Sequence, residues 1–134
     1  MTDRTMIIIK PDAVKRGLIG KVISRFEDKG FEIPKLEMMR LSEKRAKMLY
    51  AVHASKPFFK DLVSFITSGP VVVAIIEGQD ACEATRRMIG PTDPKKAPKG
   101  TIRGDFATSI TENVIHAPDS PENFLKEYKV IFSS

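Results

Sequence analysis

The chain has 134 residues, of which 42% are hydrophobic and 29% charged, a balance that is ordinary for one folded domain covering residues 1–134. Its single cysteine excludes an intramolecular disulfide and a cysteine-rich metal site, and no apolar run is long enough for a signal peptide or a membrane span, so we expect a soluble, cytoplasmic protein. The net charge of +5 favours anionic partners such as nucleotides, nucleic acid or acidic membranes.

The first elements along the chain are a strand, a loop and a helix. The segment Thr5–Lys10 is β-branched and apolar up to a proline, which predicts a buried strand. The stretch that follows, beginning PDAVKRG, is expected to be a loop. Apolar residues at helical spacing then predict a helix over Leu18–Lys29, and Gly30 is suited to end it.

The middle of the chain predicts a strand and two helices. The segment Phe31–Leu41 alternates roughly between apolar and polar residues, and Pro34 suits a strand at the edge of a sheet because proline cannot donate to the ladder. Ser42 is expected to cap a helix that runs to about Val52. A proline ends this helix, and a second short amphipathic helix is predicted over Phe58–Thr67.

The second half of the chain contains the strongest strand pattern. Val71–Glu77 is apolar enough to be covered on both faces, and a helix is predicted over Asp80–Ile89. Gly90–Asp105 is expected to be irregular, which in a small domain usually marks a functional or disordered segment. A short strand over Asn113–His116 and a helix over Ser120–Lys129 complete the order. This order predicts an α/β sandwich of the split βαβ type, with a four-stranded antiparallel sheet and helices on one face.

One of the two histidines, His116, ends the last predicted strand. A histidine there is most often a packed structural residue, but it can also be a metal ligand, an acid–base group or a nucleophile. The usual ligands of a structural zinc are absent, because the other histidine lies 63 positions away and no cysteine is near either. Glu127 lies eleven residues beyond His116, where its carboxylate could accept a hydrogen bond from Nδ1 and leave the other nitrogen as a nucleophile. The alternative for Glu127 is an exposed helical carboxylate.

Two further stretches carry groups that suit an anionic, planar ligand. In GTIRGD, Arg103 lies between glycines, and a guanidinium binds phosphate through two parallel hydrogen bonds. Lys10 ends a buried strand where a structural residue would be apolar, although a lysine can also reach from a core to solvent. In SKPFFKDL, one of the two adjacent phenylalanines is expected to be exposed, unless both serve to staple the start of the helix.

Six segments in register resemble nucleoside diphosphate kinases, namely IIKPDAV, RGLIGKVISRFEDKGFEI, KPFFKDLVSFITSGPVV, GPTDP, GTIRGDF and NVIHAPDS. The resemblance implies a ferredoxin-like βαββαβ sandwich. It also implies ping-pong transfer of the γ-phosphate of a nucleoside triphosphate to a nucleoside diphosphate through a phosphohistidine, with broad base specificity. By residue-to-residue match, His116 is the nucleophile, Glu127 orients it, and Lys10 takes part in catalysis. The match places the nucleotide contacts at Lys10, Tyr50, Phe58, Leu62, Arg86, Thr92, Arg103 and Asn113, with His53 near the phosphates.

The resemblance further implies Mg²⁺ held mainly by the nucleotide phosphates, a homo-oligomer (a hexamer, or a tetramer) built from dimers, and no membrane or nucleic acid as a main ligand. Ala117 stands where the family usually has Gly, and Pro118 where Ser is common, which removes a hydroxyl close to His116. Two alternatives stay open. One is a sheet that binds single-stranded nucleic acid, although no RNP1-like string occurs on any predicted strand. The other is a family member that has lost catalysis and acts as a scaffold.

Overall fold

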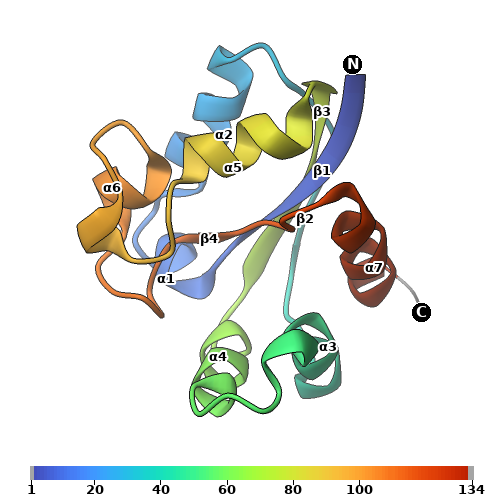
Figure 1. Cartoon of the computed structure of the whole chain (residues 1–134), viewed down its shortest axis with the longest axis vertical. Coiled ribbons are helices and arrows are strands. Elements are labelled where there is room, and N and C mark those ends of the chain that lie inside the picture. Colours follow the sequence, from blue (N-terminus) through green and yellow to red (C-terminus); the bar gives the residue numbers. More distant parts are fainter. Residues whose placement is uncertain (1, 133–134) are drawn as a thin grey trace.

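The computed structural model describes residues 2–132, and its centre is a four-stranded antiparallel sheet (Figure 1). The strands are β1 (Thr2–Ile9), β2 (Glu32–Met39), β3 (Val71–Gln79) and β4 (Ile115–His116), in the spatial order β2-β3-β1-β4. The two most apolar strands, β1 and β3, lie in the middle. β2, which contains Pro34, lies at an edge, and this confirms the position that the sequence predicts for it.

Helices connect the strands and are capped where the sequence indicates. They are α1 (Pro11–Lys15), α2 (Ile19–Asp28), α3 (Glu43–Leu49), α4 (Phe59–Ile66), α5 (Ala81–Ile89), α6 (Ile102–Phe106) and α7 (Pro121–Phe132), with 3-10 turns η1 (Ala51–His53) and η2 (Pro94–Lys96). The Ser42 and Ser120 hydroxyls each accept a hydrogen bond at 3.1 Å from a backbone N–H three residues on, which confirms both as N-caps. None of these helices of residues 2–132 combines the length and the apolar character needed to cross a bilayer.

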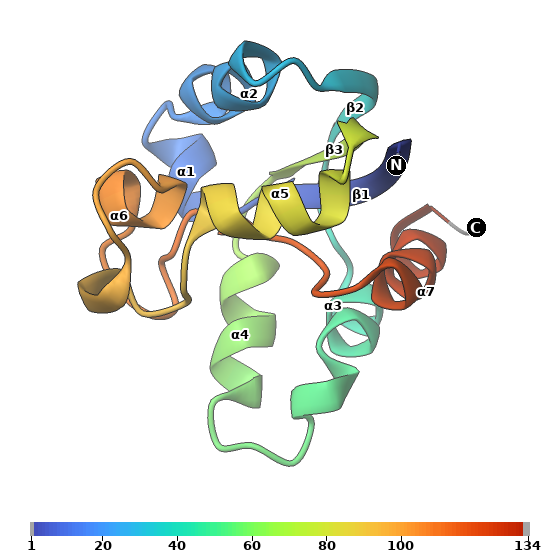
Figure 2. The same ribbon diagram turned by 45° about the horizontal axis from the view of Figure 1, so that its top comes forward.

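Helices cover both faces of the sheet, so the expectation of helices on one face is wrong (Figure 2). Ile7 and Ile9 of β1 pack with α2, α5 and α6, whereas Met6 and Ile8 pack with α3, α4 and α7. Successive side chains of a strand point to opposite faces, and β1 and β3 are apolar at nearly every central position. Both faces therefore have apolar side chains to bury. The sequence indicates this for Val71–Glu77, and coverage of that strand on both faces is confirmed.

Three local predictions are wrong. The loop expected after β1 contains α1, which starts at Pro11, a residue favoured in the first turn of a helix. The irregular segment expected over Gly90–Asp105 contains η2 and most of α6, because the Thr101 hydroxyl caps α6 by accepting a backbone N–H at 3.0 Å. The strand expected over Asn113–His116 keeps only its last two residues, because the φ of Val114 is +77° and interrupts extended backbone.

Candidate active site

The His116 imidazole and the Glu127 carboxylate are in contact. β4 pairs with β1 at the sheet edge opposite β2, and α7 folds back so that Glu127 Oε1 lies 2.5 Å from His116 Nε2. Both side chains are mostly buried, with 19% and 15% of their surfaces exposed. The contact that the sequence suggests is therefore confirmed, but it is made by Nε2 and not by Nδ1 as expected.

The choice of ring nitrogen follows from the packing of α7. An ionised carboxylate can only accept a hydrogen bond, so Nε2 carries the hydrogen and the lone pair lies on Nδ1. The spacing of eleven residues indicates that helix and ring can meet, but which edge of the ring the helix approaches depends on tertiary packing. A neutral imidazole fixed in this way has one nitrogen free to act as a nucleophile.

Tyr50 packs edge-on against the same imidazole. The ring centroids of Tyr50 and His116 are 5.7 Å apart with an interplanar angle of 81°. The Tyr50 hydroxyl is buried and has no hydrogen-bond partner among the described residues. Burial, and then the charge of Glu127, raise the pKa of Tyr50 well above its usual value, so the phenol stays neutral. Tyr50 therefore restricts the ring of His116 without adding charge to the site.

Lys10 lies directly after β1 and is only 3% exposed. Its Nζ donates a hydrogen bond of 2.7 Å to Oδ1 of Asn113, so the structure brings these two predicted site residues together. Burial and then the positive charge of Arg103 lower the pKa of Lys10, Asp12 acts in the opposite direction, and the net result is a pKa of about 8. A buried cation of this kind, rather than one that extends to solvent, is suited to an anionic ligand.

Two arginines, on α6 and α5, lie against the strand that carries His116. Arg103 of α6 is 5% exposed and donates to the carbonyl oxygens of Gly90 at 3.1 Å and of Ile115 at 2.7 Å. Its Nε has no partner among the described residues. Burial, and then the charge of Arg86, lower the pKa of Arg103 to about 10. Arg86 of α5 donates to the carbonyl oxygen of Ala117 at 3.2 Å, next to His116 in the chain. Three cations thus converge near the imidazole.

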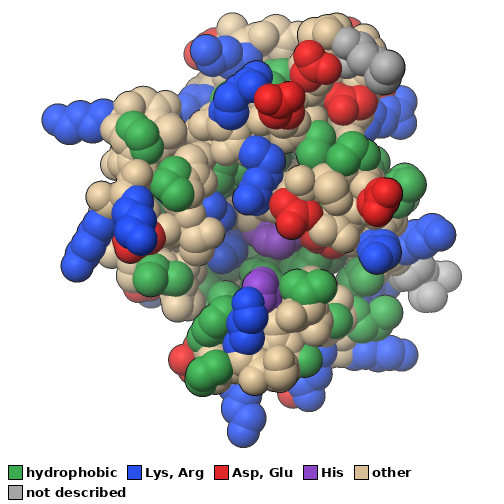
Figure 3. Space-filling model, viewed as in Figure 1, with side chains coloured by type: hydrophobic (Ala, Val, Ile, Leu, Met, Phe, Trp, Pro, Cys, Tyr) green, Lys and Arg blue, Asp and Glu red, His purple; other side chains and the backbone are tan. Residues whose placement is uncertain are grey.

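The aromatic part of the site lies on the segment before α4. Figure 3 shows both histidines of the chain in one hollow, with basic side chains around it. The rings of His53 and Phe58 have centroids 5.5 Å apart, and Phe58 is 44% exposed, whereas Phe59 packs against the core. The prediction that one of the two phenylalanines is exposed is confirmed. Leu62 is half-buried one helical turn beyond Phe58, and Thr92 lies exposed between α5 and η2.

Sequence reasoning did not find two residues that lie against this site, Asp12 and Val114. Asp12 of α1 is 7% exposed, and its Oδ2 accepts a hydrogen bond of 3.2 Å from the backbone N–H of Val114. Val114 is fully buried and precedes β4 directly. The only signal in the sequence is an aspartate two positions after Lys10, and nothing local shows that a residue more than a hundred positions away will contact it.

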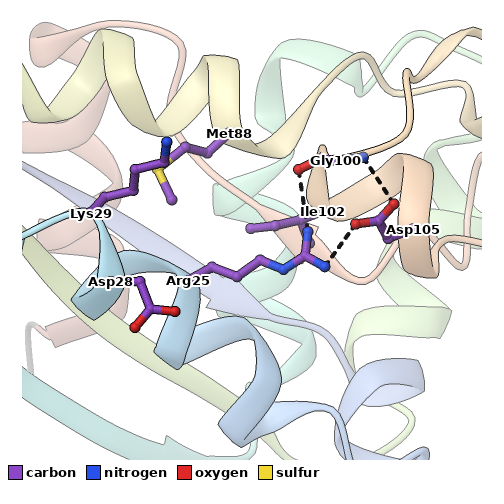
Figure 4. Close-up of a pocket in the computed structure, with 7 residues that line it drawn as sticks. All are labelled: Arg25, Asp28, Lys29, Met88, Gly100, Ile102 and Asp105. Atoms are coloured by element: carbon purple, nitrogen blue, oxygen red, sulfur yellow. Dashed lines mark hydrogen bonds and ion pairs between the residues drawn. The ribbon is translucent and has the colours of Figure 1, made fainter.

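An ion pair fastens α6, and with it Arg103, to α2 (Figure 4). Arg25 Nη2 lies 2.7 Å from Asp105 Oδ2, and Arg25 Nη1 donates to the Gly100 carbonyl oxygen at 3.3 Å. The Gly100 N–H in turn donates to Asp105 Oδ1 at 3.0 Å. The hydrogen bond from the Gly100 N–H, and then that from Arg25, lower the pKa of Asp105. They border a hollow of about 260 Å³ that is lined by Arg25, Asp28, Lys29, Met88, Gly100, Ile102 and Asp105 and by none of the residues predicted for the active site.

Comparison with known proteins identifies the family to which the chain belongs. The sequence model of the nucleoside diphosphate kinase family matches residues 3–134. The chain belongs to the nucleoside diphosphate kinase family. It is 60% identical over 131 residues to the nucleoside diphosphate kinase of Hyperthermus butylicus, covering 98% of this chain and 92% of that protein. The relative from Thermoplasma acidophilum is 53% identical over 133 residues, covering 99% of this chain and 90% of that protein.

Solved structures agree with this assignment. The nucleoside diphosphate kinase of Aquifex aeolicus superposes with a TM-score of 0.94 at 45% identity and covers 100% of this chain and 97% of that chain. The halophilic enzyme of Halobacterium salinarum, solved in complex with CDP, gives a TM-score of 0.95 at 42% identity, with coverage of 100% and 90%. The ferredoxin-like fold is confirmed. The chain is a phosphotransferase that moves the γ-phosphate of a nucleoside triphosphate to a nucleoside diphosphate.

Proposed function

We propose that this kinase acts through a phosphohistidine on Nδ1 of His116. The lone pair attacks the γ-phosphorus, the bond from that phosphorus to the oxygen bridging to the β-phosphate breaks, and the nucleoside diphosphate leaves. A terminal oxygen of a second diphosphate then attacks the phosphohistidine, and the N–P bond breaks. The observation that carries this proposal is the 2.5 Å contact between Glu127 and Nε2, which holds the hydrogen on one nitrogen and leaves the lone pair on the other.

The cations around His116 are suited to stabilise the charge of the transferred phosphoryl group. Phosphoryl transfer depends mainly on positioning and on electrostatic stabilisation, and buried, preorganised donors serve this purpose best. We assign Lys10, Arg86 and Arg103 to the phosphates. Asn113 acts through its hydrogen bond with Lys10 and contacts the ribose side of the nucleotide. Tyr50 braces the imidazole, and Thr92 and His53 are assigned to the phosphate end of the nucleotide.

We assign base binding to Phe58, with Leu62 as the apolar neighbour. An exposed aromatic ring at the mouth of a hollow can stack on any base, because every base has a π-face. The Lys56 ammonium lies over the Phe58 ring, 5.7 Å from its centre. Stacking without hydrogen bonds to the base edge predicts broad base specificity.

We propose that Mg²⁺ enters this site with the nucleotide. Among residues 2–132, no group of three or more His, Cys, Asp or Glu side chains is placed to hold a metal ion. Mg²⁺ prefers oxygen ligands in octahedral geometry and is commonly held by substrate phosphates and water, which suits a site that offers cations and few carboxylates. When bound, the ion supplies neutralising charge on the phosphate oxygens.

We further propose a cytoplasmic homo-oligomer built from dimers, a hexamer or a tetramer. The support is the open edge of β2, on which Leu36 and Met38 are 53% and 59% exposed. Unpaired strand edges that carry apolar side chains favour association with another chain. The one cysteine, Cys82, is a free buried thiol, as suits a reducing compartment. Native mass spectrometry would distinguish six, four and two copies, and a monomer at micromolar concentration would contradict this proposal.

Intact-mass analysis tests the covalent intermediate. After incubation with ATP and Mg²⁺, the protein should carry one acid-labile phosphate, and a chase with GDP should remove it. His116→Ala should abolish both steps. The matched control is the other histidine: His53→Ala should still take up one phosphate, although more slowly. Uptake of a phosphate by His116→Ala, or a wild-type phosphate that GDP does not remove, would refute the proposal.

A further inference from the structure

The turn just before β4 has a backbone conformation that valine rarely adopts. Val114 has a φ of +77°, and the N–H of Ile115 donates to the carbonyl oxygen of Asn113 at 2.9 Å. A hydrogen bond between residues two apart around a positive φ is the pattern of the rare, strained form of the γ-turn. For a β-branched residue, a positive φ is a genuine outlier. Strain of this kind persists only where the surrounding structure holds it in place.

Residues 10–12 hold both polar groups of Val114. The backbone N–H of Lys10 donates to the Val114 carbonyl oxygen at 2.8 Å, and Oδ2 of Asp12 accepts the Val114 N–H at 3.2 Å. The turn also sets Asn113, whose Nδ2 donates to the Ile110 carbonyl oxygen at 2.9 Å while its Oδ1 accepts from Lys10 Nζ at 2.7 Å. The Asp12 carboxylate therefore reaches the strained residue that separates Asn113 from the strand of the nucleophile.

Asp12 also contributes the negative charge that acts on Lys10. Burial and the guanidinium of Arg103 on α6 both lower the pKa of Lys10, and Asp12 on α1 raises it. Asn113, the hydrogen-bond partner of Lys10, is neutral. Conversely, burial raises the pKa of Asp12, and the charge of Lys10 lowers it. The second carboxylate oxygen of Asp12, Oδ1, is buried and has no hydrogen-bond partner among residues 2–132. A carboxylate that is costly to bury thus faces a cation that is costly to bury.

We propose that Asp12 is a positioning residue of phosphoryl transfer: it fixes the Val114 turn that aligns Asn113 with Lys10, and its charge keeps the Lys10 ammonium protonated for the phosphates. This inference rests on the phosphate-binding role proposed for Lys10. A carboxylate with a purely structural role would support the turn but would leave the protonation of Lys10 unchanged. The two parts of the proposal can therefore be separated by variants that change the charge and the acceptor independently.

Asp12→Asn keeps an oxygen that can accept the Val114 N–H but removes the charge, whereas Asp12→Ala removes both. Asp28→Asn removes an exposed carboxylate of α2 and is the matched control. The first measurement is the NMR titration of Lys10 in nucleotide-free protein with labelled lysine, assigned by its loss in Lys10→Met. In Asp12→Asn the titration should move to lower pH, because an opposite charge nearby favours the protonated amine. Asp28→Asn should leave it in place.

The second measurement is the pH profile of kcat/KM, which reports groups of the free enzyme. With a pKa for Lys10 of about 8 in the wild type, Asp12→Asn should lose about tenfold at pH 8.5 and stay within about twofold of the wild type at pH 6, from the usual size of a nearby charge effect. Asp12→Ala should lose about tenfold at pH 6 as well, because the turn loses its acceptor and the nucleophile is misplaced.

The outcomes separate this inference from the proposed function. An unchanged titration of Lys10 in folded Asp12→Asn would overturn the counter-charge, and full activity of Asp12→Ala at pH 6 would overturn the role of the turn. A shifted titration with an unshifted pH profile would instead overturn the assignment of Lys10 to the phosphates and leave its pairing with Asp12 standing. Should Asp12→Ala fail to fold, the charge-only variant still decides the electrostatic part.

Discussion

Replacement of Lys10 by Met should make the stability of this protein respond differently to pH. Lys10 is 3% exposed, and the charge of Arg103 acts on its ammonium. Burial lowers its pKa from 10.5 to about 8, so the folded state disfavours the charged form. Met has a similar length and no charge. The substitution therefore removes a group whose pKa differs between the folded and unfolded states, while the shape of the site is largely kept.

The sign follows from the numbers of bound protons. Between pH 8 and pH 10.5 the unfolded chain keeps the Lys10 proton while the folded chain releases it, so the free energy of unfolding of the wild type rises with pH. Integrated from pH 7 to pH 10.5, this single group contributes about 3 kcal/mol. Lys10→Met lacks this contribution. The difference in unfolding free energy, wild type minus variant, should increase by this amount across the same interval.

Urea unfolding at several pH values between 7 and 10.5 measures this difference. Other groups titrate in the same interval, but they are present in both proteins and largely cancel. The loss of a partner for Asn113 shifts the variant by a constant amount and does not affect the slope. Lys44 of α3 is exposed, and Lys44→Met is the matched control, whose difference from the wild type should stay constant. A constant difference for Lys10→Met as well would refute the reasoning that this ammonium is held charged at a cost.

Three further predictions concern the imidazole, the base and the packing of α6. Glu127→Gln should lower kcat by about 100-fold or more and leave KM within about twofold, as measured by rapid quench, because a neutral amide no longer fixes the imidazole hydrogen. Phe58→Ala should raise KM about tenfold for all nucleoside diphosphates alike, since stacking does not discriminate between bases; a loss confined to one base would contradict this. Gly104→Ala should abolish activity, because its Cβ would lie 2.0 Å from the Pro98 carbonyl oxygen. The control Gly20→Ala in α2 has free space around its Cβ. It should stabilise the fold by about 0.5 to 1 kcal/mol in thermal unfolding.

The parts of this fold that sequence patterns predicted are those with strong local signals. The unbroken apolar run Val71–Glu77 predicts the central strand and its coverage on both faces. Ser42 and Ser120 predict helix starts because an N-cap hydroxyl binds a backbone N–H only three residues further along the chain. The order of these elements then allows few topologies. Pro34 indicates that its strand lies at an edge of the sheet, and β2 does so.

The parts that sequence patterns missed depend on contacts between distant segments. α1 and α6 have five residues each, too few for a helical periodicity to be visible. The positive φ of Val114 is held by groups at positions 10 and 12, and no local preference of valine indicates it. In the same way, the spacing between His116 and Glu127 indicates their contact but not the nitrogen that makes it. These features decide the chemistry of the site, although they contribute little to the overall fold.

The buried polar atoms without partners support a site that is organised for a ligand rather than for stability. Among residues 2–132, six side chains have such atoms, and four of them, Asp12, Tyr50, His53 and Arg103, lie in or against the proposed site. Each buried group left unpaired costs about 1 to 3 kcal/mol in the free protein. Two of these groups, the Tyr50 hydroxyl and Arg103 Nε, are donors, and the phosphate oxygens of a nucleotide can accept from them. Part of their cost is then recovered only when nucleotide binds, so the donors that weaken the free fold strengthen the complex. Nucleotide should therefore stabilise the wild type more than any variant in which one of these groups is replaced by an apolar residue of similar volume.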